Sequence, residues 1–380
     1  MNTPIISIII PNWNGKRFLK GCLDSLKCQT FKDFEVIIVD NNSDDDSVLF
    51  VKENYPDVRI IELASNRGFA GGVNEGIKAA KGSLIFLLNN DTVIGEYCLQ
   101  ALYNAAGENP DTGFFATKMI FYGTNPSVIN AAGDALGIDG AARNIGYKEV
   151  DTGQYDVERE VFGACAGAAL YRRKIFDEVG LFDEDFYIVL EDVDLDFRAQ
   201  LAGYRCLYVP KAVVYHIHAG SMGKASNFTF YWITRNDLNV LIKNMPLFLL
   251  FKHFHRIFFR QIIYTYARLL GNKIRPLISG ELSSFLLLPV MLSKRYQILK
   301  GRKVSVSYID KILFKDEAVS VDKLKRFTKE QEKASALNYL SSIALFIFTE
   351  LINLPIFILS IMGCALIDTA HFLRRRIFHR

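Results

Sequence analysis

The sequence has no CxxC pair, and its six cysteines are scattered along the chain. This spacing argues against a zinc site or a disulfide framework and fits a reducing compartment. The first residues, MNTPIISIIIPNW, contain no basic segment and only a short apolar run, so we expect no signal peptide. We therefore expect the main body of the chain to lie in the cytosol.

The chain also lacks the two common glycine-rich signatures of nucleotide-binding proteins. Its glycine-rich stretch, NRGFAGG at 66–72, is not followed by Gly-Lys-Ser/Thr and does not match GxGxxG. Because a helix is expected after it, its amides could still approach a phosphate. A tight strand-to-helix turn explains the stretch equally well.

Charge is distributed unevenly. Residues 1–230 contain 21 Lys and Arg against 31 Asp and Glu, whereas residues 231–380 contain 24 against 10. The net charge of +4 therefore combines an acidic body with a basic, aromatic C-terminal part. Such a part favours an anionic surface as partner. Its apolar faces are too continuous for nucleic acid, so we expect a membrane containing anionic lipid.

Strands and helices alternate through the first hundred residues. Apolar segments with the composition of buried strands occupy 5–10, 35–39, 59–63 and 83–88. Helices are expected at 16–28, 47–54 and 73–80. The alternation predicts an α/β fold with a doubly wound, mostly parallel, Rossmann-like sheet. The polar residues that follow each strand should face one crevice, where open α/β sheets bind ligands.

Two carboxylates stand at these strand ends. Asp40 could accept hydrogen bonds from a ribose or a base edge, although it could instead cap the following turn. The fourth strand runs into Asn89-Asn90-Asp91-Thr92, which places Asp91 at the crevice. Taken alone, this tetrapeptide is as consistent with a turn as with a site.

Four segments, SIIIPNWNG, VIIVDNNSDD, NRGFAGGVNEGI and LLNNDT, in this order and spacing, resemble the family 2 glycosyltransferases. The resemblance implies the GT-A fold and inverting sugar transfer, with Asp91 in the DxD metal motif. Asn89 stands where that motif often has its first acid, a variant common in the rhamnosyltransferase-like branch. The resemblance also implies donor-binding roles for Pro11, Asn12, Trp13, Asn14, Asp40, Asn42, Asn66, Arg67, Gly71, Asn74 and Asn90.

Residues 180–198 carry many acids, and Glu191-Asp192 match the family's ED motif. The resemblance implies that Asp192 is the general base and that Glu191 orients the acceptor or the base. The alternative is that these acids stabilise a helix N-terminus. Asp194 and Arg198, at i and i+4, are expected to form a structural pair.

The segment HIHAGSMG resembles the family's HxxGxS pattern. The resemblance implies that His216, or failing it His218, completes a metal and diphosphate shell with Asp91. Such ligands suit Mg²⁺ or Mn²⁺. Trp232 and Arg235 lie in a segment that resembles rhamnosyltransferase-like members, and they are candidate contacts of the acceptor or the diphosphate. No QxxRW motif occurs, which argues against a processive synthase.

The sequence predicts three regions. Residues 1–228 form the catalytic domain, with a nucleotide-sugar half at 1–110 and an acceptor half at 111–228. Residues 229–335 form a basic amphipathic helical region, in which Lys252, Arg256, Arg260 and Arg268 recur along one expected helix at 247–270. Residues 336–380 form a hydrophobic hairpin or anchor with a basic tail. A helix packed on the catalytic domain and a soluble dimerisation hairpin are the respective alternatives.

We therefore expect a non-processive transferase at the cytoplasmic face of the cell membrane, peripheral or re-entrant. The resemblance implies transfer of L-rhamnose from dTDP-L-rhamnose to a lipid-linked saccharide during surface polysaccharide synthesis. A UDP-sugar donor is the alternative within the family. A nucleotidyltransferase and a non-catalytic membrane scaffold are alternatives from other classes. A homo-oligomer remains a further expectation.

Overall fold

The computed structural model describes residues 3–217, 226–270, 273–315, 358, 361–366 and 368. It divides into two compact units. The first comprises residues 1–135 and 142–224, and the second comprises residues 136–141 and 225–380. Each unit is described separately below.

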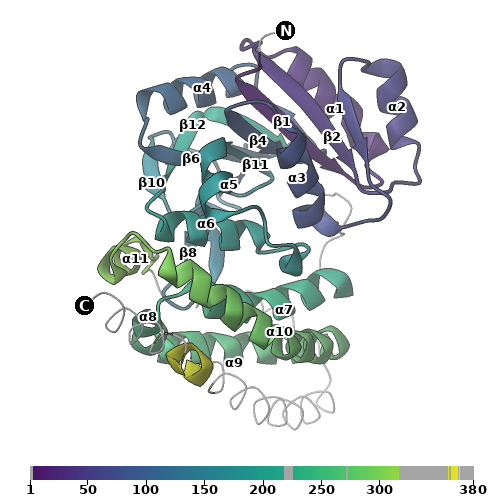
Figure 1. Ribbon diagram of the computed structural model, residues 1–380. Coiled ribbons are helices and arrows are strands. Elements are labelled where there is room, and N and C mark those ends of the chain that lie inside the picture. Colours follow the sequence, from purple (N-terminus) through teal and green to yellow (C-terminus); the bar gives the residue numbers. More distant parts are fainter. Residues whose placement is uncertain are drawn as a thin grey trace. The chain divides into compact units, whose positions relative to one another are not determined.

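The first unit is built on a mixed sheet with helices on both faces (Figure 1). Its strands are β1 (Ile6–Asn12), β2 (Phe34–Asp40), β3 (Arg59–Glu62), β4 (Leu84–Leu88), β5 (Thr92–Ile94), β6 (Thr112–Phe121), β7 (Ile129–Ala132), β10 (Arg159–Val161), β11 (Ala168–Arg172) and β12 (Arg205–His216). The main strand order is β10-β12-β6-β11-β4-β1-β2-β3, with β5 pairing with β12 and β7 with β6. A separate pair joins β8 (Asp134–Leu136) to β9 (Ala142–Asn144).

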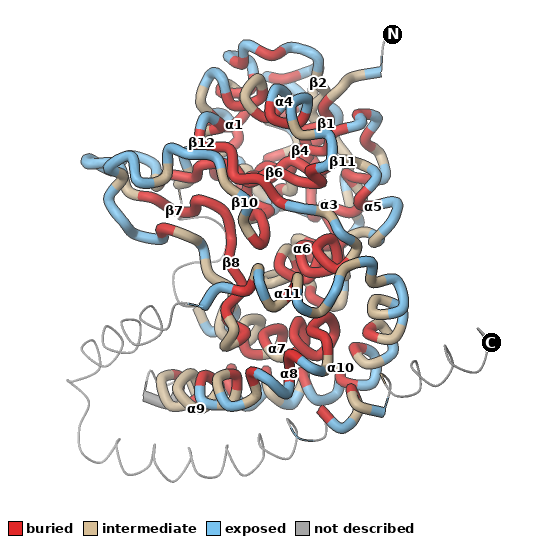
Figure 2. The backbone as a smooth tube through the Cα atoms, turned by 90° about the vertical axis from the view of Figure 1, so that its left-hand side faces the viewer, coloured by how far each residue is buried: buried red, intermediate tan, exposed pale blue. Residues whose placement is uncertain are grey.

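Two apolar layers cover the sheet. Helices α1 (Lys16–Lys27), α2 (Ser47–Asn54) and α4 (Cys98–Glu108) pack on one face, and α3 (Gly68–Ala79), α5 (Arg173–Val179) and α6 (Glu191–Leu201) pack on the other. A short 3₁₀ helix, η1, spans Glu184–Phe186. Ile8 and Ile9 of β1 point to opposite layers and are both fully buried. The central strands β1, β4 and β11 are buried over most of their length (Figure 2).

The strands β4, β1, β2 and β3 are parallel neighbours, as the alternation predicts. Beyond β4 the sheet becomes mixed, because β11 runs antiparallel to both β4 and β6. Helix α3 begins at Gly68, so the glycine-rich stretch is mostly the first turns of a helix rather than a loop. Glycine is required at Gly76 because a Cβ there would overlap with Ile9 of the sheet.

The second unit is helical. Its helices are α7 (Asn227–Asn244), α8 (Leu247–Lys252), α9 (Phe254–Leu270), α10 (Ile274–Lys300) and α11 (Val306–Ile312). The helix expected at 247–270 is divided at His253, whose imidazole contacts the Asp310 carboxylate at 2.9 Å. Within the described residues, α10 alone is long and apolar enough to cross a membrane. Most of the predicted hairpin at 336–367 lies outside the described residues.

The prediction that the cations of 247–270 form one exposed, lipid-facing row is wrong at two positions. Arg260 and Arg268 are buried. Arg260 donates to both carboxylate oxygens of Asp237 at 2.8 and 2.7 Å, so its charge is compensated inside the unit. Lys252 remains exposed but pairs with Asp310 at 2.7 Å.

Candidate active site

The polar ends of β1, β2 and β4 meet through side-chain hydrogen bonds. The buried amide of Asn12 donates to Asp40 Oδ1 at 3.0 Å and accepts from Asn90 Nδ2 at 2.7 Å. The second oxygen of Asp40 accepts from the Ser43 N–H at 2.9 Å. Asp40 therefore caps the turn after β2 and also orders the neighbouring strand end.

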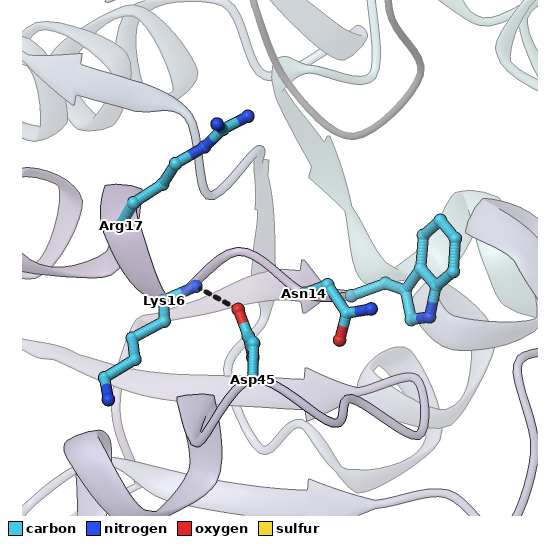
Figure 3. A pocket seen from close by; sticks show the side chains of 5 residues that line it. Asn14, Lys16, Arg17 and Asp45 are labelled. Carbon is cyan, nitrogen blue, oxygen red and sulfur yellow. Dashed lines mark hydrogen bonds between the residues drawn. The ribbon is translucent and has the colours of Figure 1, made fainter.

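A hollow of about 650 Å³ opens beside this edge (Figure 3). It is lined by Trp13, Asn14, Lys16, Arg17 and Asp45. Asn14 has a positive φ of 50°, and its N–H donates to the Ser43 hydroxyl at 2.9 Å. The residue before it, Trp13, is 42% exposed. The predicted residue Asn42 is also left-handed, with φ 64°.

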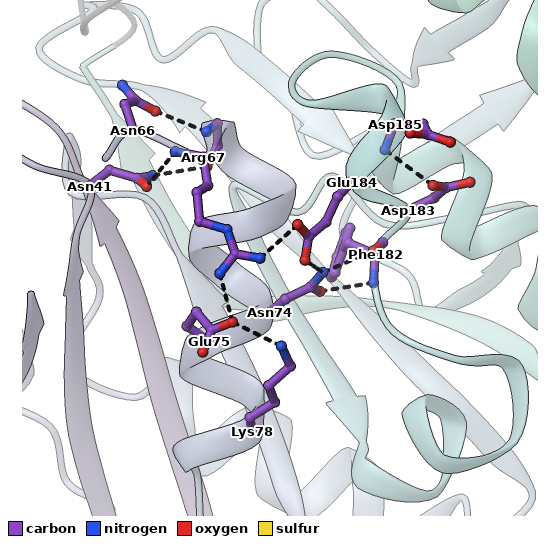
Figure 4. A network of polar contacts seen from close by, with 11 residues as sticks. Asn41, Asn66, Arg67, Asn74, Glu75, Lys78, Phe182, Asp183, Glu184 and Asp185 are labelled. Carbon is purple, nitrogen blue, oxygen red and sulfur yellow. Dashed lines mark hydrogen bonds and ion pairs between the residues drawn. The ribbon is translucent and has the colours of Figure 1, made fainter. Parts of the chain in front are cut away.

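Two predicted residues, Arg67 just before α3 and Asn74 within it, connect this helix to residues 182–184 (Figure 4). Arg67 pairs with Glu75 at 2.8 Å and with Glu184 at 2.7 Å. Asn74 is buried; its amide donates to the Phe182 carbonyl at 2.9 Å and accepts from the Phe182 N–H at 3.0 Å.

The other predicted donor-binding residues of this region also contact neighbouring parts of the chain. Asn66 accepts hydrogen bonds from the Gly68 N–H at 2.8 Å and the Tyr187 hydroxyl at 3.2 Å. A Cβ at Gly71 would lie 2.6 Å from Cβ of Arg67. Pro11 lies within β1. Donor binding by these residues stays a prediction, and the structure shows that several of them also hold the fold together.

Replacing Asn74 by alanine is expected to lower the free energy of unfolding by about 1–3 kcal/mol, because the Phe182 backbone groups lose their partners. Urea denaturation measures this loss. The exposed Asn104 of α4 provides the control, since Asn104→Ala should change stability by less than about 0.5 kcal/mol. A variant N74A as stable as the control would contradict the structural role.

Asp91 and His216 come together at the edge of the sheet. Antiparallel pairing of β5 with β12 sets Thr92 opposite His216, and the Ile217 N–H donates to the Asp91 carbonyl at 2.9 Å. Nε2 of His216 thereby lies 3.3 Å from Oδ1 of Asp91. Nδ1 of His216 lies 3.0 Å from Oδ1 of Asn130 on β7. A donor hydrogen on Nδ1 would leave the Nε2 lone pair facing the aspartate.

This arrangement fits a divalent cation. A carboxylate oxygen and an imidazole nitrogen at this separation can share one ion, and the Asn130 contact fixes the ring as second-sphere partners of metal-binding histidines do. Oxygen and nitrogen donors suit Mg²⁺ or Mn²⁺. His218 lies outside the described residues, so the alternative ligand is not tested.

A second set of acids surrounds the start of α6. Asp192 is partly accessible, and its carboxylate accepts from the N–H groups of Ala166 at 3.2 Å and Val193 at 2.8 Å. Side-chain ligand atoms of Asp134, Cys165 and Asp192 lie within 4.8 Å of one another. Burial raises the pKa of the Cys165 thiol well above its usual range, so this thiol is a poor metal ligand.

The pKa values of the acids near Asp192 are raised further than the pKa of Asp192 itself. Burial raises the pKa of Asp134, Glu191 and Asp196 well above the usual carboxyl range, and the Asp192 charge raises each of them further. Burial raises the pKa of Asp192 as well, but its backbone donors oppose this. Of these four carboxyl groups, Asp192 therefore loses its proton most readily.

The remaining predicted pair in α6 is structural. Arg198 pairs with Asp194 at 2.9 Å, as the i, i+4 spacing predicts. The guanidinium also donates to the carbonyls of Val179, Gly180 and Leu181 at 2.6, 3.2 and 2.9 Å. Arg198 thus secures the segment that precedes η1.

Sequence reasoning missed Asp134 and Asn130. Both lie in the region assigned to acceptor loops, where glycine and asparagine obscure any periodicity. Asp134 exchanges backbone hydrogen bonds with Gly163 at 2.8 and 3.1 Å, which brings it beside Asp192. The one available signal was a lone acid after the segment 128–132, which is apolar except for Asn130, and it is too weak to identify a partner.

Trp232 and Arg235 belong to α7 in the second unit. The Arg235 guanidinium lies 4.9 Å from the Trp232 ring centroid and donates to the Ser283 hydroxyl of α10 at 3.1 Å. Their proposed contact with an acceptor or a diphosphate stays a prediction.

Comparisons with known proteins indicate the family of residues 7–180. Residues 7–180 match the family model described as glycosyl transferase family 2. O-antigen biosynthesis protein RfbC of Myxococcus xanthus is 28% identical over 61% of this chain, but the match spans only 19% of RfbC. The N-acetylglucosaminyl-diphospho-decaprenol L-rhamnosyltransferase of Mycobacterium tuberculosis (strain ATCC 25618 / H37Rv) is 27% identical over 58% of this chain and 79% of its own length.

The fold has a counterpart among solved structures. The crystal structure of GalNAc-T7 with UDP, GalNAc and Mn²⁺ gives a TM-score of 0.52 at 16% identity, covering 64% of this chain and 48% of that one. At this identity the likeness concerns the fold alone. The match of the family model, supported by the similarity to the two relatives, shows that residues 7–180 form a domain of glycosyl transferase family 2.

Proposed function

We propose that the first unit transfers a sugar from a nucleotide sugar to an acceptor hydroxyl, with inversion at the anomeric carbon. The observation that carries the proposal is the placement of Asp91 beside His216, at 3.3 Å, on the sheet edge where Asn12, Asp40 and Asn90 also meet. The family match of residues 7–180 supports the reaction class.

Asp91 and His216 would hold Mg²⁺ or Mn²⁺ at this edge, with Asn130 orienting the imidazole. When bound, the ion neutralises the negative charge of the departing diphosphate. Asn12, Asp40 and Asn90 order the strand ends next to it, and the hollow beside Trp13 and Asn14 is the proposed place for the nucleotide.

Asp192 would act as the base. Its carboxylate takes the proton of the acceptor hydroxyl while the hydroxyl oxygen forms a bond to the anomeric carbon. The bond from that carbon to the diphosphate oxygen breaks, and the nucleoside diphosphate leaves with the bonding electrons. The N–H groups of Ala166 and Val193 keep the carboxylate ionised and oriented.

L-Rhamnose from dTDP-L-rhamnose is the proposed donor, and a lipid-linked saccharide is the proposed acceptor. The name of the mycobacterial relative supports L-rhamnose as the sugar and a lipid-linked acceptor, whereas the dTDP carrier is implied by the resemblance of the sequence alone. A UDP-sugar is the second candidate donor. A relative named for transfer of another sugar, poly(ribitol-phosphate) beta-glucosyltransferase of Bacillus spizizenii (strain ATCC 23059 / NRRL B-14472 / W23), is 37% identical over 32% of this chain and 22% of its own length. A non-catalytic scaffold would leave the paired Asp91–His216 arrangement and Asp192 without a use.

We also propose that the second unit associates with the cytoplasmic face of a membrane. Support comes from the length and composition of α10 and from its exposed apolar side chains, including Leu282 and Leu286. Phe248, Phe251 and Phe259 on α8 and α9 are exposed as well. Flotation of the full chain with vesicles tests this part, and protein that stays at the bottom of the gradient would contradict it.

The donor is identified by thermal unfolding with a panel of nucleotide sugars in the presence of Mn²⁺. A ligand that binds the folded state stabilises it by about 2.7 kcal/mol when its concentration is 100 times its Kd, and the melting temperature rises as a result. We expect dTDP-L-rhamnose to give the largest shift. If no nucleotide sugar shifts the transition, with or without Mn²⁺, the proposed function is wrong.

A further inference from the structure

Arg268 of α9 is a buried cation in the second unit. Its side chain and backbone together are 6% exposed. The guanidinium carbon lies 5.7 Å from the centroid of the Tyr264 ring. Among the described residues, the guanidinium has no carboxylate partner and donates no hydrogen bond. Buried charges in proteins are otherwise paired or hydrogen-bonded, so this side chain calls for an explanation.

The nearby acids do not provide a partner. Asp237 uses both oxygens on Arg260, at 2.8 and 2.7 Å, and also accepts from Gln261 at 2.8 Å. Burial lowers the pKa of Arg268, although the charges of Asp237 and Glu281 act in the opposite direction. Both acids therefore influence Arg268 from a distance without pairing with it.

Thr265 lies one helical turn before Arg268 and also carries a hydrogen-bonding group without a described partner. It is 0% exposed, and its hydroxyl has no hydrogen-bond partner in the described part of the chain. Residues at i and i+3 are neighbours on a helix surface. Within the described residues, two side chains one helical turn apart, one of them a cation, thus have no acceptor for their hydrogen-bond donors.

We propose that Arg268 and Thr265 bind a phosphate group within the second unit. A phosphate suits this pair because a guanidinium fork can bind two of its oxygens while a hydroxyl on another side chain reaches a third. Tyr264 stacks beside the guanidinium and limits its movement. The proposal concerns this unit alone and does not depend on the sugar-transfer reaction of the first.

Two binding assays on the full chain test the proposal and distinguish a soluble phosphate from the phosphate of a lipid headgroup. Inorganic phosphate is titrated calorimetrically, and phosphatidylcholine vesicles with and without phosphatidic acid are used in flotation. We expect the wild-type protein to bind in at least one assay, and Arg268→Gln to weaken that binding about tenfold or more. The control R275Q removes the same charge from an exposed position on α10 and should bind like wild type.

Binding of free phosphate indicates a soluble ligand, and Arg268-dependent binding to phosphatidic acid vesicles alone indicates a lipid headgroup. Both support the proposal. Failure of both assays, or equal binding by R268Q, overturns it. Arg268→Met is the second variant. It removes the charge together with the cation contact of Tyr264, and it should lose the same binding as R268Q. Binding by R268M equal to that of the wild-type protein would also overturn the proposal.

Discussion

Replacing Asp192 by asparagine is expected to reduce sugar transfer about 10²–10⁴-fold and to leave donor affinity unchanged. Asparagine keeps the shape of the side chain, and its one carbonyl oxygen can accept from either the Ala166 or the Val193 N–H group but not from both. It cannot take the proton of the acceptor hydroxyl. Initial rates of product formation measure the loss. Donor binding is followed separately by calorimetry, which shows whether the site remains intact.

The matched control for this variant is Asp134→Asn. Burial and the Asp192 charge raise the pKa of Asp134 well above its usual range, so a neutral amide should replace it with less than about a tenfold change in kcat/KM, or ~1.4 kcal/mol. The base assignment is wrong if D192N retains its rate. A large loss in D134N combined with normal turnover in D192N would transfer the role of base to Asp134.

The rate should also depend on pH in a defined direction. Burial raises the pKa of Asp192, so its carboxylate becomes protonated at a higher pH than an ordinary aspartate does. The base is lost when it is protonated. The rate should therefore fall as pH decreases through this raised pKa, and the acidic limb of the kcat/KM profile should lie above the range of an exposed aspartate.

Replacing Asp91 by asparagine is expected to remove most transfer activity, by about 10²-fold or more at a metal concentration that saturates the wild-type protein. The change takes away the anionic oxygen that faces Nε2 of His216 at 3.3 Å. Rates are measured as Mn²⁺ is varied, which separates weaker metal binding from slower chemistry. Asp111→Asn is the control, because Asp111 is an exposed acid just before β6 and should be dispensable.

Asn130 allows a graded version of this experiment. Its amide oxygen contacts Nδ1 of His216 and touches no proposed ligand other than that ring. Asn130→Ala should therefore weaken metal affinity about 10–100-fold without abolishing the site. Saturating Mn²⁺ should restore much of the N130A rate. If Mn²⁺ dependence in N130A matches that of the wild-type protein, the orienting role is excluded.

The parallel part of the fold could be predicted because its signals are local. Uninterrupted apolar segments such as 84–88 are typical of strands buried on both faces. The helices that connect these strands allow them to pair in parallel. Parallel strands place their carboxyl ends at one edge, which is why Asn12, Asp40 and Asn90 meet as expected. Asp91 and His216 followed from matched motifs, and the β5–β12 pairing explains their proximity.

Features that depend on long-range partners could not be predicted. The row of cations on 247–270 had the spacing of a lipid-binding helix, but a spacing does not reveal that Asp237 lies against Arg260. Similarly, nothing local marks Asp134 as a neighbour of Asp192, because its position depends on pairing with Gly163. The glycines of 66–72 were ambiguous since close helix–sheet packing and phosphate binding both require small residues.

The most direct test of the central claim is Mn²⁺ binding measured by electron paramagnetic resonance in the presence of a nucleoside diphosphate. Wild-type protein should bind Mn²⁺ tightly, whereas D91N and His216→Ala should each lose most of this binding and D111N should retain it. Binding by D91N and H216A equal to that of the wild-type protein would show that Asp91 and His216 do not form the metal site.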